Sequence, residues 1–389
     1  MRKFWRAKFD GVCSSEIWVM SGKKISNDFL FYLIQTEKFT QIANVSTGTK
    51  MPRADWDYMQ EIPFSIPPLK EQEKIARILG VWDSAIDSLA NLIKAKRKYK
   101  TALMQRLLTP PRYTTSCHTE GVARSIQKDD LQGNDICLDS SLSAKAQNDK
   151  EKNAENGREI NPQNDKENTH NDKKKIRESS LRFAGFSDKW QEFQLGDIGF
   201  AYGGLTNKTQ QHFNCGQYKY ITYKNIFENF KIDLNILESV DILENESQNA
   251  VKFGDVFFTI SSEMPQEVGM CSVLLDELKN TYLNSFCFGF RANKNILYPN
   301  FASYYFRNYH FRKDIYKLAQ GSTRYNISKN EVLNLKIKLP TIAEQKKIAQ
   351  VLSACDKEIE TLNLKFECLK AQKKGLMQQL LSGKVRVKC

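Results

Sequence analysis

The sequence contains one pattern twice. LKEQEKIARIL at residues 69–79 aligns with IAEQKKIAQVL at residues 342–352, so that Gln72 falls opposite Gln345 at an offset of 273 residues (345 − 72). The same offset holds without a gap for residues 48–108, and a looser likeness continues upstream, one residue out of register. About sixty residues that keep one register are not a product of chance, so the chain is predicted to be a tandem repeat.

Each copy of the pattern predicts a long helix, over residues 67–110 and 341–386. Apolar residues recur at alternating spacings of four and three, which is the heptad pattern of coiled coils. Thr341 and Glu344 fit a capping box at the start of the second helix. The two helices can pack on each other as a rigid spacer, and a dimerisation helix is the alternative that heptads alone leave open. The predicted seam residues are Ile75, Leu79, Trp82, Ile86, Leu89, Ile348, Leu352, Ile359, Leu362 and Phe366.

Residues 111–180 contrast with the rest of the chain. They lack apolar periodicity and contain few aromatic residues, so they cannot bury enough surface to offset their ordering entropy. We predict a disordered polar linker there. This linker holds 12 Lys and Arg against 13 Asp and Glu, whereas the whole chain has a net charge of +13. The remaining 46 basic and 32 acidic residues give +14 in the folded parts. Such a balance favours a polyanionic partner, nucleic acid first, over a role in solubility alone.

The block at residues 181–340 reads as a compact α/β (α+β) domain. Strand-like runs occur at 218–227, 254–260 and 285–292, and helical patterns extend over 299–317. This mixture predicts a twisted sheet with helices packed against it.

At this point the residues resemble a known family, the DNA specificity (S) subunits of type I restriction–modification enzymes. The resemblance is carried by RFAGFSDKWQEFQLGDI (182–198), GDVFF (254–258), the stretch from AQGSTRYNIS to KIAQVL (319–352), and KKGLMQQLLSGKVRV (373–387). The first block repeats the succession over residues 46–79. The likeness covers essentially all of the chain except the linker, and its ordered series of motifs is more specific than any one of them.

The resemblance implies two target-recognition domains that alternate with two long helices, which pack as an intramolecular antiparallel coiled coil. Each recognition domain would read one half of a bipartite DNA site. The helical pair would set the spacing and dock the methyltransferase (modification) subunits, which recruit the motor-nuclease (restriction) subunits. S-adenosylmethionine, ATP and Mg²⁺ are expected on those partner subunits and not on this chain.

The first block departs from the family pattern. Residues 1–66 match only the C-terminal part of a recognition domain, whereas residues 181–340 match a complete one. Either an upstream reading frame supplies the rest, or the chain is a truncated form that acts as a self-dimer or is inactive. Two further alternatives are a self-contained restriction or methylation enzyme and a coiled-coil protein without sequence-specific DNA binding.

DNA recognition requires hydrogen bonds to base edges and contacts from Lys and Arg to phosphates. Turn residues combined with cations occur at 203–211, 222–225 and 321–326. The resemblance places the last of these at the DNA-facing surface, although a solvated loop is the plain alternative for each residue. The candidate contacts are Lys208, Lys224, Asn225, Ser322, Thr323, Arg324, Tyr325 and Asn326, with Thr49, Lys50 and Arg53 in the first block.

The sequence contains no recognisable catalytic motif. It lacks an adenine-methyltransferase NPPF/Y signature, a glycine-rich cofactor loop and a GxxxxGK[ST] phosphate loop. Nine cysteines form no CxxC pair and the histidines have no metal-ligand spacing, so we expect no metal site and reduced thiols. Without a secretory signal or an apolar run long enough for a membrane span, a cytoplasmic, non-catalytic DNA-binding subunit is predicted.

Overall fold

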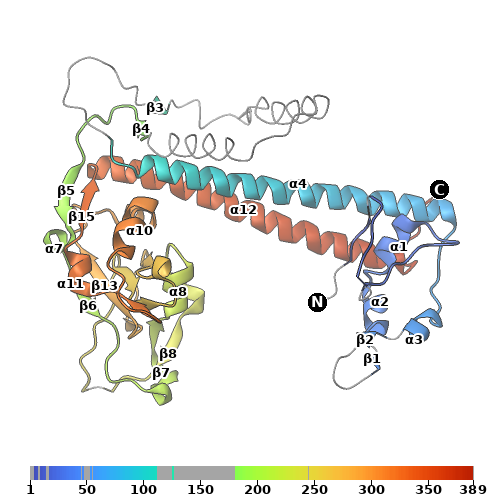
Figure 1. The fold of residues 1–389 in the computed structure, drawn as a ribbon, viewed down its shortest axis with the longest axis horizontal. Coiled ribbons are helices and arrows are strands. Elements are labelled where there is room, and N and C mark those ends of the chain that lie inside the picture. Colours follow the sequence, from blue (N-terminus) through green and yellow to red (C-terminus); the bar gives the residue numbers. More distant parts are fainter. Residues whose placement is uncertain are drawn as a thin grey trace. The chain divides into compact units, whose positions relative to one another are not determined.

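The structure, a computed structural model, describes residues 4–7, 9–14, 17–44, 46–47, 53–54, 56–111, 125–126, 180–243 and 245–388. Most of the predicted linker therefore lies outside the described residues. The chain divides into two compact units: unit 1 comprises Met1–Lys98 and Asp356–Cys389, and unit 2 comprises Tyr99–Cys355 (Figure 1). Within the described ranges, no helix combines the length and apolar character needed to cross a lipid bilayer.

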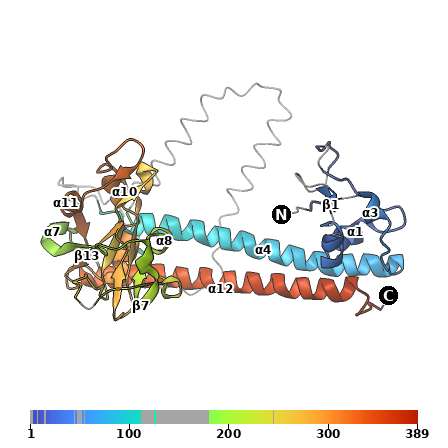
Figure 2. The same ribbon diagram turned by 90° about the horizontal axis from the view of Figure 1, so that it is seen from below.

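Two long helices, α4 (Leu69–Leu107) and α12 (Ile342–Leu381), each contribute to both units. In each unit their segments run side by side (Figure 1, Figure 2). In unit 1, Asp83 pairs with Lys373, whereas Lys96, further along α4, pairs with Glu358 at 2.7 Å. Since partner numbers fall along α12 as they rise along α4, the helices are antiparallel there.

Four of the predicted seam residues share a core with the other long helix: Ile75 and Leu79 with the end of α12 in unit 1, and Ile348 and Leu352 with the end of α4 in unit 2. Ile75, Leu79, Ile348 and Leu352 are buried, and the seam residues between them are half-buried, as a two-helix pair without a third layer allows. No seam residue is exposed. Five of these residues lie on each helix, and all are at least partly buried, as the residues of an apolar stripe are.

Unit 1 places short elements before α4. They are α1 (Asn27–Leu33), α2 (Glu37–Ile42), β1 (Ser46–Thr47), β2 (Arg53–Ala54) and α3 (Trp56–Gln60), with β1 and β2 antiparallel. The unit has a small core of apolar side chains from α1, the start of α4 and the end of α12: Phe29, Tyr32, Leu33, Ile75, Ala76, Leu79, Met377, Leu380 and Leu381.

Unit 2 is built around an antiparallel sheet in the order β11-β9-β13-β6, beside a mixed sheet in the order β12-β7-β8. The strands of these sheets are β6 (Gly199–Gly203), β7 (Phe213–Ile221), β8 (Glu238–Val240), β9 (Val256–Thr259), β11 (Cys271–Val273), β12 (Thr281–Leu283) and β13 (Cys287–Ala292). Two-stranded pairs are β5 (Gln191–Gln194) with β15 (Lys336–Leu339), β10 (Ser261–Ser262) with β14 (Tyr325–Asn326), and β3 (Ser125–Ile126) with β4 (Arg182–Phe183).

The helices of unit 2 are short. They are α7 (Leu195–Ile198), η2 (Gln210–His212), α8 (Tyr223–Glu228), η3 (Leu234–Ile236), η4 (Pro265–Glu267), α9 (Pro299–Tyr305), α10 (Tyr309–Tyr316) and α11 (Lys329–Leu333). Aromatic side chains of the sheet and of α9 and α10 share one core with Leu107 of α4 and Leu352 of α12. The predicted α/β fold with two long helices is thus confirmed.

One expected strand is shorter than predicted. The run at 218–227 remains extended only to Ile221, because Thr222 accepts a hydrogen bond from the backbone N–H of Asn225 at 3.2 Å and caps α8. A threonine in this position favours the start of a helix over the continuation of a strand. Consequently Tyr223 and Lys224 lie on the first turn of a helix at the end of β7.

The repeated Glu-Gln pair holds the start of α4 in unit 1. Gln72 Nε2 donates to the carbonyl of Pro67 at 2.8 Å, and its Oε1 accepts from the N–H of Ser26, which precedes α1, at 2.8 Å. The Glu71 carboxylate accepts two close hydrogen bonds from the guanidinium of Arg386, at 2.8 and 2.6 Å. The segment that follows α12 is thereby fastened to the start of α4.

The second copy makes corresponding contacts in unit 2. Gln345 Nε2 donates to the carbonyl of Pro340 at 2.9 Å, and its Oε1 accepts from the N–H of Tyr298, which precedes α9, at 2.8 Å. The Glu344 carboxylate accepts from Nε and Nη2 of Arg182 at 2.9 and 2.6 Å. The backbone N–H of Glu344 donates to the Thr341 hydroxyl at 3.4 Å, as a capping box requires. The Glu344 carboxylate, which would complete the box, instead accepts from Arg182. The predicted box is therefore only half formed.

Candidate nucleic-acid interface

The loop at residues 321–324 is exposed and is closed by a residue that must be glycine. Gly321 has a φ of +127°, and a Cβ at this position would lie 2.2 Å from the carbonyl oxygen of Arg324. Ser322, Thr323 and Arg324 are all exposed to solvent. Within the described part of the chain, Arg324 has no ion-pair partner, so its guanidinium is available for an anion.

The base of this loop is fixed by backbone pairing. Gln320 and Asn326 exchange two hydrogen bonds, at 2.9 and 2.8 Å. Strand β14 also pairs with β10, which places Tyr325 opposite Ser262 and Asn326 opposite Ser261. Tyr325 is half-buried and packs against the main core, whereas Asn326 is exposed. Of the two, Tyr325 anchors the loop and Asn326 faces outward.

The start of α8 lies beside this loop. The Tyr223 hydroxyl donates to the carbonyl of Ser261 in β10 at 2.7 Å, and burial raises the pKa of that hydroxyl while the charge of Arg324 opposes the shift. Lys224 is well exposed, and its ammonium is 4.0 Å from the Glu228 carboxylate, a surface pair that contributes little. We call residues 223–224, 261–264 and 321–326 the candidate interface. Sequence reasoning missed its central segment, residues 261–264, because two serines after a strand carry no specific signal.

Two half-buried arginines, Arg307 and Arg312, bind backbone carbonyls of segments next to the candidate interface. Arg307 donates to four carbonyls, those of Ile226, Phe227, Asn229 and Cys271, at 2.6 to 2.9 Å. Burial lowers the pKa of this guanidinium, but an arginine side chain remains charged in proteins. Arg307 therefore ties the end of α8 to strand β11.

Arg312 of α10 holds the backbone of the segment after β10. Its guanidinium donates to the carbonyls of Gln266, Val268 and Gly269 at 2.6 to 2.7 Å, and burial again lowers its pKa. Hydrogen bonds to charged groups stabilise more than neutral ones. The two arginines stand in FRNYHFR (306–312), and the only sequence signal for them was two cations in an otherwise aromatic helical run.

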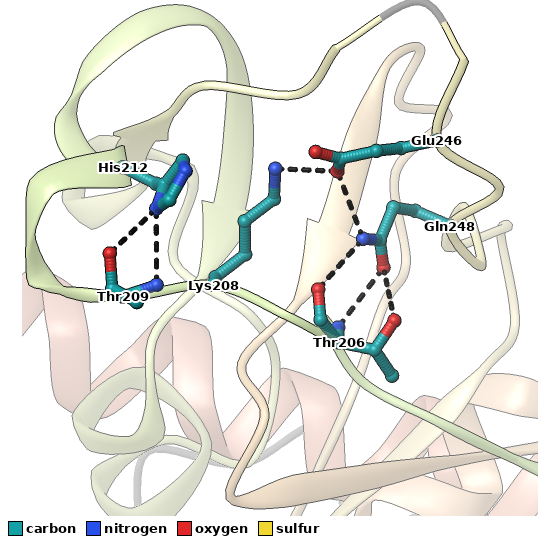
Figure 3. Close-up of polar contacts among 6 residues, drawn as sticks. All are labelled: Thr206, Lys208, Thr209, His212, Glu246 and Gln248. Atoms are coloured by element: carbon teal, nitrogen blue, oxygen red, sulfur yellow. Dashed lines mark hydrogen bonds and ion pairs between the residues drawn. The ribbon is translucent and has the colours of Figure 1, made fainter.

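The predicted contact Lys208 points into the domain. Its side chain is only 1% exposed, and its ammonium forms an ion pair with Glu246 at 2.5 Å (Figure 3). Gln248 bonds to the backbone and hydroxyl of Thr206 from the same side of the loop (Figure 3). This ion pair lowers the pKa of the Glu246 carboxyl. In this structure Lys208 fastens the loop at 206–212 and does not present a cation to DNA, which corrects its predicted place.

Asn225 is also placed differently from the prediction. It is fully buried, its Nδ2 donates to the carbonyl of Asp233 at 2.8 Å, and its Oδ1 accepts from the N–H of Asp233 at 3.0 Å and from Asn229 at 3.1 Å. The amide thus closes the turn between α8 and η3. As a buried residue it supports the fold and has no surface from which to contact a base.

The candidate contacts of the first block are less fully described. Thr49 and Lys50 lie outside the described residues, as does the side chain of Arg53. The backbone of Arg53 pairs with Thr47 in the β1–β2 ladder. Among the described residues, no group of three or more His, Cys, Asp or Glu side chains could hold a metal ion.

A family model for the type I restriction modification DNA specificity domain matches residues 2–97 and 187–367 of this chain. These two segments cover well over half of the sequence and include the larger part of both repeated helices, α4 up to residue 97 and α12 up to residue 367. The chain belongs to this DNA specificity family. The resemblance seen in the sequence is therefore confirmed.

Named relatives agree with this assignment. The chain is 25% identical over 397 residues to the type I restriction enzyme MjaVIII specificity subunit of Methanocaldococcus jannaschii, a match that covers 97% of this chain and 75% of the relative. It is 30% identical over 203 residues to the putative type I restriction enzyme MjaX specificity subunit of the same organism, covering 50% of this chain and 46% of the relative. A solved chain, from work on complex assembly and conformational transition of the type I R-M system, shares the fold with a TM-score of 0.51 at 16% identity, over 93% of this chain and 73% of that one.

Proposed function

We propose that this chain is the sequence-specific DNA-recognition subunit of a type I restriction–modification complex and that it reads part of a split DNA target. The observation that carries the proposal is the glycine-closed loop at 321–326. It presents exposed polar side chains and Arg324, which has no ion-pair partner among the described residues, and its base is closed by the two backbone hydrogen bonds between Gln320 and Asn326. Arg307 and Arg312 hold the neighbouring segments at the end of α8 and after β10. Polar groups and cations on a rigid backbone suit base and phosphate contacts.

We further propose that the chain is non-catalytic and works in the cytoplasm with partner subunits. Methyltransferase (modification) subunits would dock on the long helices, and the motor-nuclease (restriction) subunit would join through the assembled complex. The family resemblance supports this docking role for the two helices. S-adenosylmethionine, ATP and Mg²⁺ would be held by the partners.

A selection of duplexes from a random library tests DNA recognition directly. The full chain, purified alone and with its modification subunit, is expected to enrich one motif. A bipartite motif would indicate two working recognition regions, and a palindromic motif would indicate a self-dimer. Failure to enrich any motif in either form would contradict the proposed function.

The loop contact has a matched test in the salt dependence of binding. If Arg324 contacts a phosphate, Arg324→Ala is expected to reduce the slope of log K against log salt by about 0.9. Lys336→Ala is the control, because Lys336 is an exposed cation on β15 that pairs with Glu192 at 3.5 Å, outside the candidate interface. An unchanged slope for Arg324→Ala would contradict the contact.

The non-catalytic assignment is tested with the isolated chain. Duplex DNA incubated with S-adenosylmethionine, ATP and Mg²⁺ is expected to remain unmethylated and uncut until the partner subunits are added. Methylation or cleavage by the chain alone would instead establish a self-contained enzyme.

A further inference from the structure

Phe286 is an exposed aromatic residue on a fixed turn between β12 and β13. Its side chain is 61% exposed. The turn is held by Asn284, whose Oδ1 accepts from the N–H of Phe286 at 2.8 Å and whose carbonyl accepts from the N–H of Cys287 at 3.1 Å. Cys287 is buried at the start of the central strand β13. The ring is therefore displayed from a rigid backbone and not from a loose loop.

The backbone of Phe286 adjoins the candidate interface. The carbonyl of Phe286 accepts from the N–H of Ile260 at 3.0 Å, and the carbonyl of Ile260 accepts from the N–H of Ile327 at 3.0 Å. Ile260 directly precedes β10, and Ile327 directly follows β14. Two strand spacings of about 4.8 Å each place Phe286 roughly 10 Å from the end of the 321–326 loop. Met264, a second exposed apolar residue, follows β10 on the same segment.

The charges of the candidate interface and of the segment after β10 are mixed. Lys224 and Arg324 are exposed cations of the candidate interface, whereas Glu263 and Glu267 are exposed carboxylates on the segment after β10. A surface that only bound phosphates would exclude carboxylates. Base edges in the major groove present donors, acceptors and the thymine methyl group, so a set of cations, carboxylates and an apolar ring matches them.

We propose that Phe286 is a specificity-determining residue, whose ring enters the major groove of the bound duplex and packs against the 5-methyl group of a thymine. This inference rests on the proposed function. The methyl group is the one apolar feature of the base edges in the groove, and an exposed aromatic ring on a fixed turn can meet it with little loss of conformational freedom.

The test uses the full chain and the duplex that it enriches from a random library. Thymines of this duplex are replaced by uracil one at a time, which removes only the methyl group. Wild-type protein is expected to lose about fourfold in affinity at one thymine, as for one buried methyl group. Phe286→Ala is expected to bind the thymine duplex more weakly and to show no further loss with uracil at that position.

Phe200→Ala is the matched control. Phe200 is 56% exposed but pairs with Arg291, near the other end of β13 from Cys287, about 13 Å away along the strand. It is expected to bind both duplexes as the wild type does. The proposal is overturned if Phe286→Ala binds like the wild type, or if every uracil substitution affects both proteins equally. If the wild type enriches no motif, the proposed function fails instead, so the two failures are distinguishable.

Discussion

The starts of α4 and α12 have the same local sequence but different surroundings. In both, the glutamine bonds to the carbonyl of a proline five residues earlier, Pro67 for Gln72 and Pro340 for Gln345. The preceding glutamate pairs with an arginine in both. Arg182 of unit 2 is buried at 8% exposure, whereas the Arg386 side chain of unit 1 is 67% exposed.

The repeated sequence therefore specifies the same contacts at the starts of both helices. It does not specify how much each contact contributes to the free energy of unfolding. At the start of α4, Glu71 binds Arg386, which follows α12 in the chain. At the start of α12, Glu344 binds Arg182, which follows α4 in the chain. A buried pair costs more to break than an exposed one, because a charge left alone in the interior cannot be solvated. The two starts should therefore respond unequally to equal substitutions.

The largest effect is expected at Glu344. Glu344→Ala leaves the Arg182 guanidinium buried without its carboxylate, and we expect it to reduce the free energy of unfolding by about 3–5 kcal/mol. Glu71→Ala should reduce it by much less, because solvent reaches Arg386. Urea unfolding of both variants measures the difference. Equal losses would remove the distinction between the two units.

A double substitution separates the lone charge from the lost packing. Arg182→Met with Glu344→Leu replaces the buried pair by apolar side chains of similar volume, and such replacements are often neutral or stabilising. This variant should recover most of the loss caused by Glu344→Ala. A double variant as unstable as the single one would show that the pair itself, and not the uncompensated charge, stabilises unit 2.

A smaller effect is expected for the glutamines. Gln345→Ala removes the partners of the Tyr298 N–H and of the carbonyls of Pro340 and Ile296, and should cost about 1–3 kcal/mol. Gln72→Ala removes one contact fewer, so its cost should be lower by about 1 kcal/mol. Thermal unfolding monitored by circular dichroism measures both. A larger loss for Gln72→Ala would reverse the ranking of the two units.

The smallest effect expected is the pH dependence of the stabilisation by the Glu71–Arg386 pair. The hydrogen bonds from Arg386, and then from the N–H of Val387, lower the pKa of Glu71 below its ordinary 4.5. A depressed pKa means that the stabilisation is complete above the ordinary value and is lost as the pH falls through the folded-state pKa. The melting-temperature difference between wild type and Arg386→Ala should be constant near neutral pH and shrink below about pH 4.5. A difference unchanged down to pH 3 would exclude the carboxylate as its source.

Much of the fold was predictable because its signals are local. Heptad spacing specifies which face of a helix is buried, and Ile75 and Ile348 follow it. The constant offset predicted that Gln72 and Gln345 stand in equivalent places, and both bond to an equivalent proline. The loop at 321–326 was predictable from glycine and small polar residues, and the φ of Gly321 explains why glycine is needed there.

The rest depends on residues far apart in the sequence. Lys208 is turned inward by Glu246, and Asn225 is enclosed by the turn to Asp233, so neither burial could be read from its neighbours. Arg307 and Arg312 bind carbonyls, which every residue has, and carbonyl partners leave no trace in the sequence. For such contacts the sequence shows which residue types are present, but it does not show which groups they bind.

The small core of unit 1 has a consequence for the order of synthesis. Ile75 of α4 packs with Leu380 of α12, and 305 residues separate them. At ribosomal rates of about 5–20 residues per second, the interval is on the order of 15 to 60 seconds. Unit 1, whose residues 27–79 are made before unit 2, is thus the later of the two units to complete its core. Until Leu380 leaves the ribosome, the apolar face of α4 in unit 1 lacks the part of its cover that α12 supplies and is shielded only by α1, so a nascent chain needs protection there.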